Sequence, residues 1–303
     1  MAALTGLVKP CYVFAPRTLV RRIGMSFARP GHPIDTVRLP WGSVIEVNAN
    51  EGIGRELIRQ NVFDIAVTET AWRLLEEGDV AVDVGANIGY LTSLFAARVG
   101  LRGRVEAFEP HPRIFARLRK NVDNLKFGAA PVTIGLHEYA LGSRDGTARL
   151  LEPSAFRINE GASTLVTGPD AVGVQDSAGF EIRLARLDTV LADCDIGLLK
   201  VDVEGFEPEV FAGAERLLAR QRIRNIIYEA HDCERSPLHC LLSQYGYSVF
   251  GIGHDLFGLR ITPGIAAPQV DRRWESPSYL ATLSAGAVLP SLQARGWQVL
   301  QRC

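Results

Sequence analysis

The stretch DVAVDVGANIGY at residues 79–90, followed after a helical segment by RVEAFEP at residues 104–110, decides the fold. The valines of the first stretch are β-branched and bounded by glycine, which predicts a buried strand. Apolar residues recur at helical spacing over residues 88–99, and a glycine ends that helix. A second short strand, residues 105–108, ends on Glu109. Strand, glycine turn, helix, strand and acid form the βαβ layout of a nucleotide-binding half-fold.

The turn of small residues predicts close contact with a ligand. It contains Gly85, Ala86, Asn87 and Gly89, and bulky side chains here would keep a ligand away from the backbone. The helix that follows points free N–H groups at the same place. Glu109 lies about twenty residues after Gly89, the separation typical of an acid that accepts two hydrogen bonds from a ribose diol. The sequence therefore predicts all five residues as cofactor-binding residues.

The spacing of this loop distinguishes between nucleotides. A dinucleotide fingerprint would place glycine at 85, 87 and 90, but Asn87 and Tyr90 occupy two of these positions. The spacing Gly85-x-Asn87-x-Gly89 after Asp83 instead resembles the loop of methyltransferases that depend on S-adenosylmethionine (SAM). Because SAM has no pyrophosphate, the third glycine is not required. We therefore expect SAM as the cofactor and Asp83 among its binding residues. A structural βα turn in another α/β enzyme is the alternative.

Composition argues against several classes of protein. The chain has 303 residues, 47% hydrophobic and 22% charged residues, and a formal net charge of −1, as in an ordinary soluble globular protein. Such a chain has no global field to attract nucleic acid or an anionic membrane. No run of about eighteen uncharged apolar residues occurs, so no membrane span is expected. The five cysteines include no C-x-x-C pair, which disfavours disulfides and structural zinc and indicates a reducing cytoplasm.

The second informative stretch is GLLKVDVEGFE at residues 197–207. Its apolar half predicts a buried strand with Asp202 at the carboxyl end, where ligands bind in an open α/β sheet. We therefore expect Asp202 beside the reactive end of the cofactor, as both a binding and a catalytic residue. For Glu204, a functional role and an exposed ion pair with Lys200 are equal alternatives.

Two further residues follow predicted strands. Glu138 comes after the third strand, where the loop passes near the adenine in this architecture. It either accepts a hydrogen bond from the adenine amino group or is exposed to solvent. His231 follows the strand at residues 223–229, at the same sheet edge as Asp202. It is the best-placed of the six histidines to act as a general base, and a structural or solvated histidine is the alternative.

The rest of the chain is expected to complete one α/β domain with an extension at each end. Residues 1–38 form an N-terminal extension with short helices, which serves as a cover over the sheet edge, a homodimer contact or an acceptor-binding lid. The domain covers residues 39–285, with an inserted hairpin and a long loop at 146–187 that is a candidate acceptor-site flap. Residues 286–303 form a tail with a short helix. The remaining predicted elements are a hairpin at 38–48, helices at 52–77, 111–126, 206–220 and 236–245, and strands at 131–136, 247–252 and 278–284.

Together these motifs resemble the FkbM family of methyltransferases over residues 40–285. The resemblance is carried by Asp83 to Thr92, Phe108-Glu109-Pro110, Ala140-Leu141-Gly142, Leu187-Asp188 and Lys200 to Glu207. It implies an α/β, Rossmann-like class I methyltransferase fold with a seven-stranded, mostly parallel sheet and helices on both faces. It also implies SAM-dependent methyl transfer, usually to a hydroxyl oxygen of a sugar, a glycan or a small natural product. Two positions depart from the family: Glu138, where Asn is common, and Asp64, where Glu is common.

Methyl transfer to a hydroxyl group requires alignment, exclusion of water and removal of a proton. We expect Asp202 or His231 to be the base. No metal is expected, because the spacing does not support a site built from Asp202 and Glu229. A nicotinamide-dependent oxidoreductase and a catalytically silent partner subunit are the alternatives. The missing glycines argue against the first, and the intact cofactor loop with its ribose acid argues against the second. No nucleic-acid partner is expected from so neutral a chain.

Overall fold

The computed structural model describes residues 9–14, 34–125, 132–152, 164–166, 179–230, 236–264 and 277–302. Its centre is an eight-stranded sheet of order β13-β12-β14-β11-β10-β3-β4-β5. These strands are β3 (Val80–Val84), β4 (Arg104–Phe108), β5 (Thr133–His137), β10 (Ile196–Val201), β11 (Ile223–Glu229), β12 (Ser248–Asp255), β13 (Gly258–Pro263) and β14 (Ser278–Thr282). Strands β11, β10, β3, β4 and β5 are parallel. β14 pairs antiparallel with β11 and β12, and β13 pairs antiparallel with β12.

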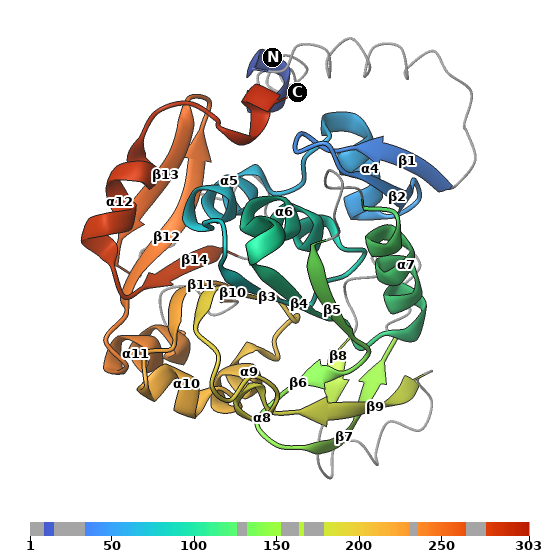
Figure 1. Cartoon of the computed structure of the whole chain (residues 1–303), viewed down its shortest axis with the longest axis vertical. Coiled ribbons are helices and arrows are strands. Elements are labelled where there is room, and N and C mark those ends of the chain that lie inside the picture. The colour runs from blue at the N-terminus through green and yellow to red at the C-terminus, as the bar shows by residue number, and fades with distance from the viewer. Residues whose placement is uncertain are drawn as a thin grey trace.

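The central strands are apolar because helices cover both faces of the sheet. All six residues of β10 are buried, as expected of a parallel strand between two helical layers. The helices are α4 (Gly52–Gln60), α5 (Ile65–Leu74), α6 (Tyr90–Val99), α7 (Pro112–Asp123), α8 (Leu187–Val190), α9 (Glu207–Ala212), α10 (Glu215–Ala219) and α11 (Pro237–Gln244). Figure 1 shows α5, α6 and α7 on one face and α8 to α11 on the other. The predicted α/β fold with helices on both faces is confirmed. Across the described ranges, none of the helices combines the length and apolar character needed to cross a bilayer.

The sheet has one strand more than the seven predicted. The sequence pattern indicated a loop after residue 252, but β12 continues to Asp255 and turns back into β13. In β13, Leu259 and Ile261 are buried while Arg260 between them is exposed. This alternation is typical of an edge strand with one buried face.

Residues 206–220 form two short helices where one was predicted. α9 ends at Ala212 and α10 begins at Glu215. Gly213 lies between them, and a Cβ atom there would be 2.0 Å from the carbonyl oxygen of Gly142. The two backbone segments therefore touch at this position, and a residue with a side chain would not fit there.

A second sheet confirms the predicted insertion. Its order is β6-β9-β7-β8. Its strands are β6 (Ala140–Leu141), β7 (Gly146–Leu151), β8 (Thr164–Val166) and β9 (Gly179–Ala185). β7 and β9 are the antiparallel pair that the sequence predicted. Most of the long loop proposed as an acceptor-site flap lies outside the described residues.

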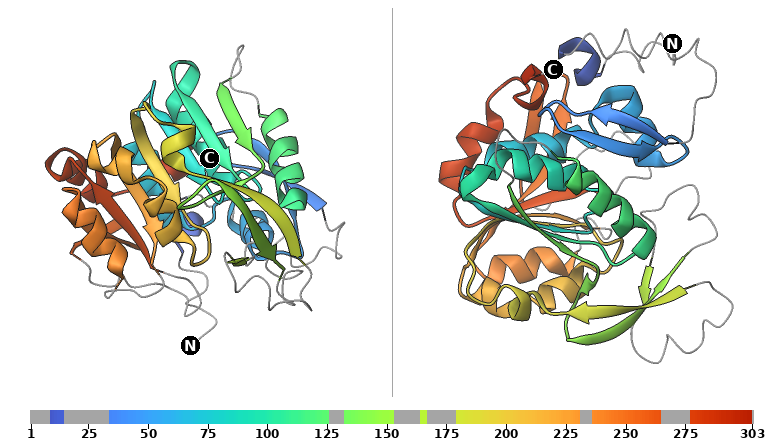
Figure 2. Two further views of the ribbon diagram at one scale, coloured as in Figure 1. Left: turned by 90° about the horizontal axis from the view of Figure 1, so that it is seen from below. Right: turned by 45° about the vertical axis from the view of Figure 1, so that its right-hand side comes forward.

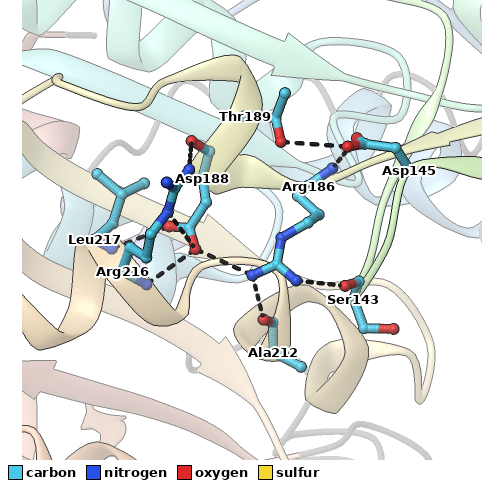
Figure 3. Close-up of polar contacts among 8 residues, drawn as sticks. All are labelled: Ser143, Asp145, Arg186, Asp188, Thr189, Ala212, Arg216 and Leu217. Carbon is cyan, nitrogen blue, oxygen red and sulfur yellow. Dashed lines mark hydrogen bonds and ion pairs between the residues drawn. The ribbon is translucent and has the colours of Figure 1, made fainter.

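Asp188, in α8, joins this second sheet to the helices on the adjacent face of the main sheet (Figure 3). Its buried carboxylate accepts hydrogen bonds from the backbone N–H groups of Arg216 (2.9 Å) and Leu217 (3.0 Å) and pairs with Arg186 (3.2 Å). Arg186 also donates to the carbonyl oxygen of Ser143 (2.8 Å). Asp188 therefore holds the first turn of α10 against the end of β9.

The N-terminal part contains a hairpin of β1 (Ile34–Arg38) and β2 (Val44–Asn48), which Figure 2 shows at the opposite end of the molecule from the second sheet. The predicted turn at Trp41-Gly42 is confirmed: Gly42 has a φ of +92°, and its N–H donates to the carbonyl oxygen of Leu39 at 2.9 Å. The last residues of the expected extension are thus a strand. One helix of that extension, α2 (Pro10–Phe14), lies within the described residues.

The C-terminal tail forms α12 (Ala285–Gln293) and a 3-10 turn, η4 (Val299–Arg302), and confirms the predicted tail helix. A buried ion pair of α5, Arg73 to Glu69 at 2.6 Å, anchors it. The Glu69 carboxylate accepts from the N–H groups of Gln298 (2.8 Å) and Val299 (2.9 Å). The Arg73 guanidinium donates to backbone carbonyl groups of residues 291–296. The tail is therefore part of the fold, attached to a helix that also borders the candidate site.

Candidate active site

The predicted cofactor loop connects β3 to α6 at the carboxyl edge of the sheet. Gly85, Asn87 and Gly89 have φ values of +77°, +50° and +87°. A Cβ atom at Gly85 would be 1.9 Å from the carbonyl oxygen of Asp202, and one at Gly89 would be 2.8 Å from Cδ1 of Leu118. The atoms that exclude a side chain here belong to the protein. Positive φ and internal packing therefore both favour glycine here, and the close approach of a ligand stays a prediction.

Glu109 lies at the end of β4, beside this loop. It is 6% exposed, and its two carboxylate oxygens accept hydrogen bonds from the N–H groups of Asn87 (3.0 Å) and His111 (2.9 Å). Burial raises the pKa of Glu109 to about 7, although both N–H groups oppose the shift. The backbone of Ala86 is held by the same strand, through a hydrogen bond to the carbonyl oxygen of Phe108 (3.0 Å). The loop and the predicted ribose acid therefore form one unit.

Lys200 links this unit to Asp202. Its Nζ atom is 3.7 Å from Asp83, 3.2 Å from Asp202 and 3.2 Å from the carbonyl oxygen of Gly85. Burial lowers the pKa of Lys200, but Asp202 and Asp83 outweigh burial and raise it above its usual value. Burial raises the pKa of Asp83, which also accepts a hydrogen bond from Thr92 (2.6 Å). Two carboxylates therefore share one buried cation, and the alternative of an exposed Lys200–Glu204 pair is wrong.

A cavity with about 390 Å³ of empty space, including open solvent at its mouth, adjoins Lys200 and Asp202. Asp64, Tyr90 and Glu229 also line it. Four elements meet there, because β10 and β11 end side by side and the first turns of α5 and α6 also line the cavity. The cavity thus lies at the carboxyl edge of the parallel strands, where ligands bind in open α/β sheets.

Hydrogen bonds hold the helical wall of this cavity. The Tyr90 hydroxyl accepts from the N–H of Phe63 (3.1 Å) and shares a hydrogen bond with the Thr68 hydroxyl (3.1 Å). Asp64 caps α5 by accepting from the N–H of Val67 (3.0 Å) and has a φ of +36°. A non-glycine residue with this backbone conformation is strained, and such strain clusters at functional sites.

The predicted site residues fall into three groups. Asp83, Gly85, Ala86, Asn87, Gly89, Glu109 and Asp202 converge on the carboxyl edge of β3, β4 and β10. Glu138 is exposed and lies 3.7 Å from Arg119, so its contact in this structure is with a surface arginine. His231 lies outside the described residues.

Sequence reasoning did not assign cavity roles to Asp64, Tyr90 and Glu229. Glu229 ends β11 just as Asp202 follows β10, so the same argument from strand ends would have found it. Asp64 and Tyr90 carried no such signal, because their place depends on how α5 and α6 pack. Within the described ranges, His, Cys, Asp and Glu side chains form no group of three that could hold a metal ion.

Known proteins are similar to this chain in sequence. The methyltransferase FkbM domain profile matches residues 83–249. The 31-O-demethyl-FK506 methyltransferase FkbM of Streptomyces tacrolimicus is 30% identical over 250 residues, 74% of this chain and 93% of that protein. The hexuronic acid methyltransferase AglP of Haloferax volcanii is 33% identical over 159 residues, 52% of this chain and 57% of that protein. A crystal structure of methyltransferase FkbM from Methylobacillus flagellatus aligns with a TM-score of 0.43 and 15% identity, over 75% of this chain and 60% of that chain.

The domain profile covers more than half of the chain, from Asp83 into β12, and includes the predicted cofactor loop and residues 197–207. The Streptomyces relative extends the similarity over nearly its whole length. On these two findings, the chain belongs to the FkbM methyltransferase family.

Proposed function

We propose that this methyltransferase uses SAM to methylate a hydroxyl oxygen of a sugar, a glycan or a small natural-product intermediate. One observation carries the proposal: the cofactor loop, the acid Glu109 and a cavity with several carboxyl groups meet at one edge of the sheet. Family membership supports the reaction class. The names of two relatives support the acceptor class, because one refers to an O-demethyl natural product and the other to a hexuronic acid.

The residues present fit this cofactor. Each oxygen of Glu109 accepts one N–H group in the structure and keeps a second lone pair, so an ionised Glu109 has the capacity to accept the two hydroxyl groups of a ribose. Asp83 is fully buried, and its Oδ1 atom has no hydrogen-bond partner within the described residues. Such an atom beside Lys200 is suited to a polar ligand group. Glu138 is proposed to contact the adenine, which requires it to leave Arg119.

When bound, SAM supplies an electrophilic methyl group on a positively charged sulfur. The protein has to align the acceptor oxygen, exclude water and accept a proton. Asp202 lies beside Lys200 at the floor of the cavity, in position to orient either reactant. From the sequence alone, we propose Asp202 or His231 as the proton acceptor.

The first test is binding of S-adenosylhomocysteine (SAH) measured by calorimetry, followed by transfer from labelled SAM into a host extract. The extract is then separated into small molecules, glycans, protein and nucleic acid. We expect SAH to bind and label to enter the small-molecule or glycan fraction. Glu109→Ala should abolish both results, whereas Glu77→Ala, a matched change at a side chain that is 59% exposed, should preserve them.

Each contrary outcome has a definite meaning. Label in protein or nucleic acid would overturn the acceptor class. SAH binding without label in any fraction would favour the silent partner subunit. Binding of NAD in preference to SAH would overturn the proposal that SAM is the cofactor.

We also propose a reducing compartment, the cytoplasm, for this protein. Among the described residues, Cys11, Cys194 and Cys240 are free thiols. Free thiols are typical of proteins in a reducing environment. Full reaction of all five cysteines with a thiol reagent, in protein unfolded without reductant, is the expected result.

A further inference from the structure

Glu229 lines the cavity with a carboxyl group that no other described residue binds. β10 and β11 are parallel neighbours in which Val201 is opposite Tyr228, so Asp202 and Glu229 leave the sheet side by side. Both line the cavity. Asp202 is ion-paired with Lys200 at 3.2 Å. Within the described part of the chain, the Glu229 carboxyl group makes no hydrogen bond or ion pair.

The charges around Glu229 are mostly negative. Asp202 from the end of β10, Asp64 from the start of α5 and Glu204 from the loop before α9 all act on it, and Lys200 of β10 opposes them. Lys200 is the one cation among the described residues that line the cavity, and it already forms ion pairs with Asp83 and Asp202. The residues of β14 and α6 that line the cavity are uncharged. The described lining of the cavity therefore has three acidic residues, Asp64, Asp202 and Glu229, and one cation.

This excess of acidic groups determines whether the Glu229 carboxyl group is protonated. Burial, followed by Asp202 and Asp64, raises the pKa of Glu229 well above neutral. In the ligand-free protein at neutral pH, Glu229 therefore keeps its proton. A cation placed in the cavity would stabilise the ionised form and release that proton.

We propose that Glu229 is a catalytic residue, which accepts the proton of the acceptor hydroxyl group while the positively charged sulfur of the cofactor occupies the cavity. This inference rests on the function proposed above. An oxygen lone pair forms the new O–CH₃ bond, the S–CH₃ bond breaks with its electron pair left on sulfur, and the O–H proton passes to the Glu229 carboxylate. The sulfur is then neutral, so the proton stays on Glu229 until the next cofactor molecule binds.

Asp202 is less suited to this step. Its carboxylate is already engaged in an ion pair with the Lys200 ammonium group at 3.2 Å. Its ion pair with Lys200 gives Asp202 a positioning role, because Lys200 also contacts the cofactor loop at the carbonyl oxygen of Gly85.

The test compares proton release on binding of SAM and of SAH, by calorimetry in phosphate and Tris buffers at pH 8. The two ligands share every ionisable group and differ in the charge on sulfur. We expect SAM to release about one proton more than SAH from the wild-type protein, and Glu229→Gln to remove this difference. Glu215→Gln, a matched change at an exposed position of α10, should keep it.

Turnover provides a second measurement. Glu229→Gln should lower methyl transfer into the extract fraction labelled by the wild type about 100-fold or more, the usual contribution of a general base. SAH affinity should stay within about twofold, which would show that the variant folds and keeps its cofactor site. Equal proton release by SAM and SAH, or wild-type turnover of Glu229→Gln, would overturn the inference and leave the proposed function standing. Failure of both ligands to bind would overturn the proposed function and the inference with it.

Discussion

Replacing Asp188 by alanine should be among the most destabilising single changes in this protein. The carboxylate is fully buried and accepts two backbone hydrogen bonds, from Arg216 at 2.9 Å and Leu217 at 3.0 Å. Hydrogen bonds to a charged group contribute about 1.5–3 kcal/mol each, and the ion pair with Arg186, whose side chain is 32% exposed, adds at most about 1 kcal/mol. These contributions overlap, since the same carboxylate makes them. We therefore expect a loss of about 3–5 kcal/mol in the free energy of unfolding.

Urea unfolding followed by tryptophan fluorescence and by circular dichroism would measure this loss. Asp188→Asn should lose less, about 2 kcal/mol, because the amide keeps one oxygen that accepts a backbone hydrogen bond. Asp195→Ala is the matched control. Its carboxylate is 79% exposed and pairs with Arg222 at 3.0 Å, so its loss should be at most about 1 kcal/mol. If Asp188→Ala were no more destabilising than this control, the reasoning from buried hydrogen bonds would be refuted.

Arg73→Met should speed trypsin cleavage within residues 291–296, because Arg73 donates to the carbonyl groups that hold this segment. An unchanged cleavage rate would contradict the anchoring role. Gly85→Ala should abolish SAH binding in calorimetry, because its Cβ atom would be 1.9 Å from the carbonyl oxygen of Asp202 and its φ is +77°, and wild-type affinity would be the contrary result. SAH affinity should rise as pH increases towards about 7 and then level off, because the free protein holds the pKa of Glu109 at about 7 and only the ionised form accepts both ribose hydroxyl groups. Glu109→Ala should lose this pH dependence, and retention of it would assign the effect to another group.

The order of helices and strands was predictable because the pattern of apolar residues in each segment matches the burial of that segment in the fold. The valines of β3 and the apolar residues of β10 are buried on both faces, and they read as strands for that reason. The turn at Gly42 and the end of α6 at Gly100 were predictable from glycine alone. The prediction failed at β13, because its short alternation of buried and exposed residues is a weaker signal than the apolar run of a buried strand. It also failed at residues 213–214, where the chain contacts Gly142 and the predicted single helix is interrupted.

The positions of the predicted cofactor loop and of Glu109 were largely predictable, and the make-up of the cavity wall was not. The loop from Gly85 to Gly89 and Glu109 lie within one βαβ unit, so their proximity follows from sequence order. Asp202 was placed by the rule that ligands bind at carboxyl ends of parallel strands. The ion pair between Lys200 and Asp83 was not predictable. Lys200 lies opposite Asp83 across two paired strands that are distant in sequence.

By itself, the sequence determined the α/β class, the family and the set of residues that form the cofactor loop, because these depend on contacts between near neighbours in the chain. The tertiary structure alone decided how charge is distributed in the cavity. Asp64, Asp202 and Glu229 come from three separate elements, and a single lysine is shared between Asp83 and Asp202. The protonation of Glu229 depends on the summed field of these groups and on their removal from water. Neither quantity is a property of any local stretch of sequence, so only the folded chain specifies it.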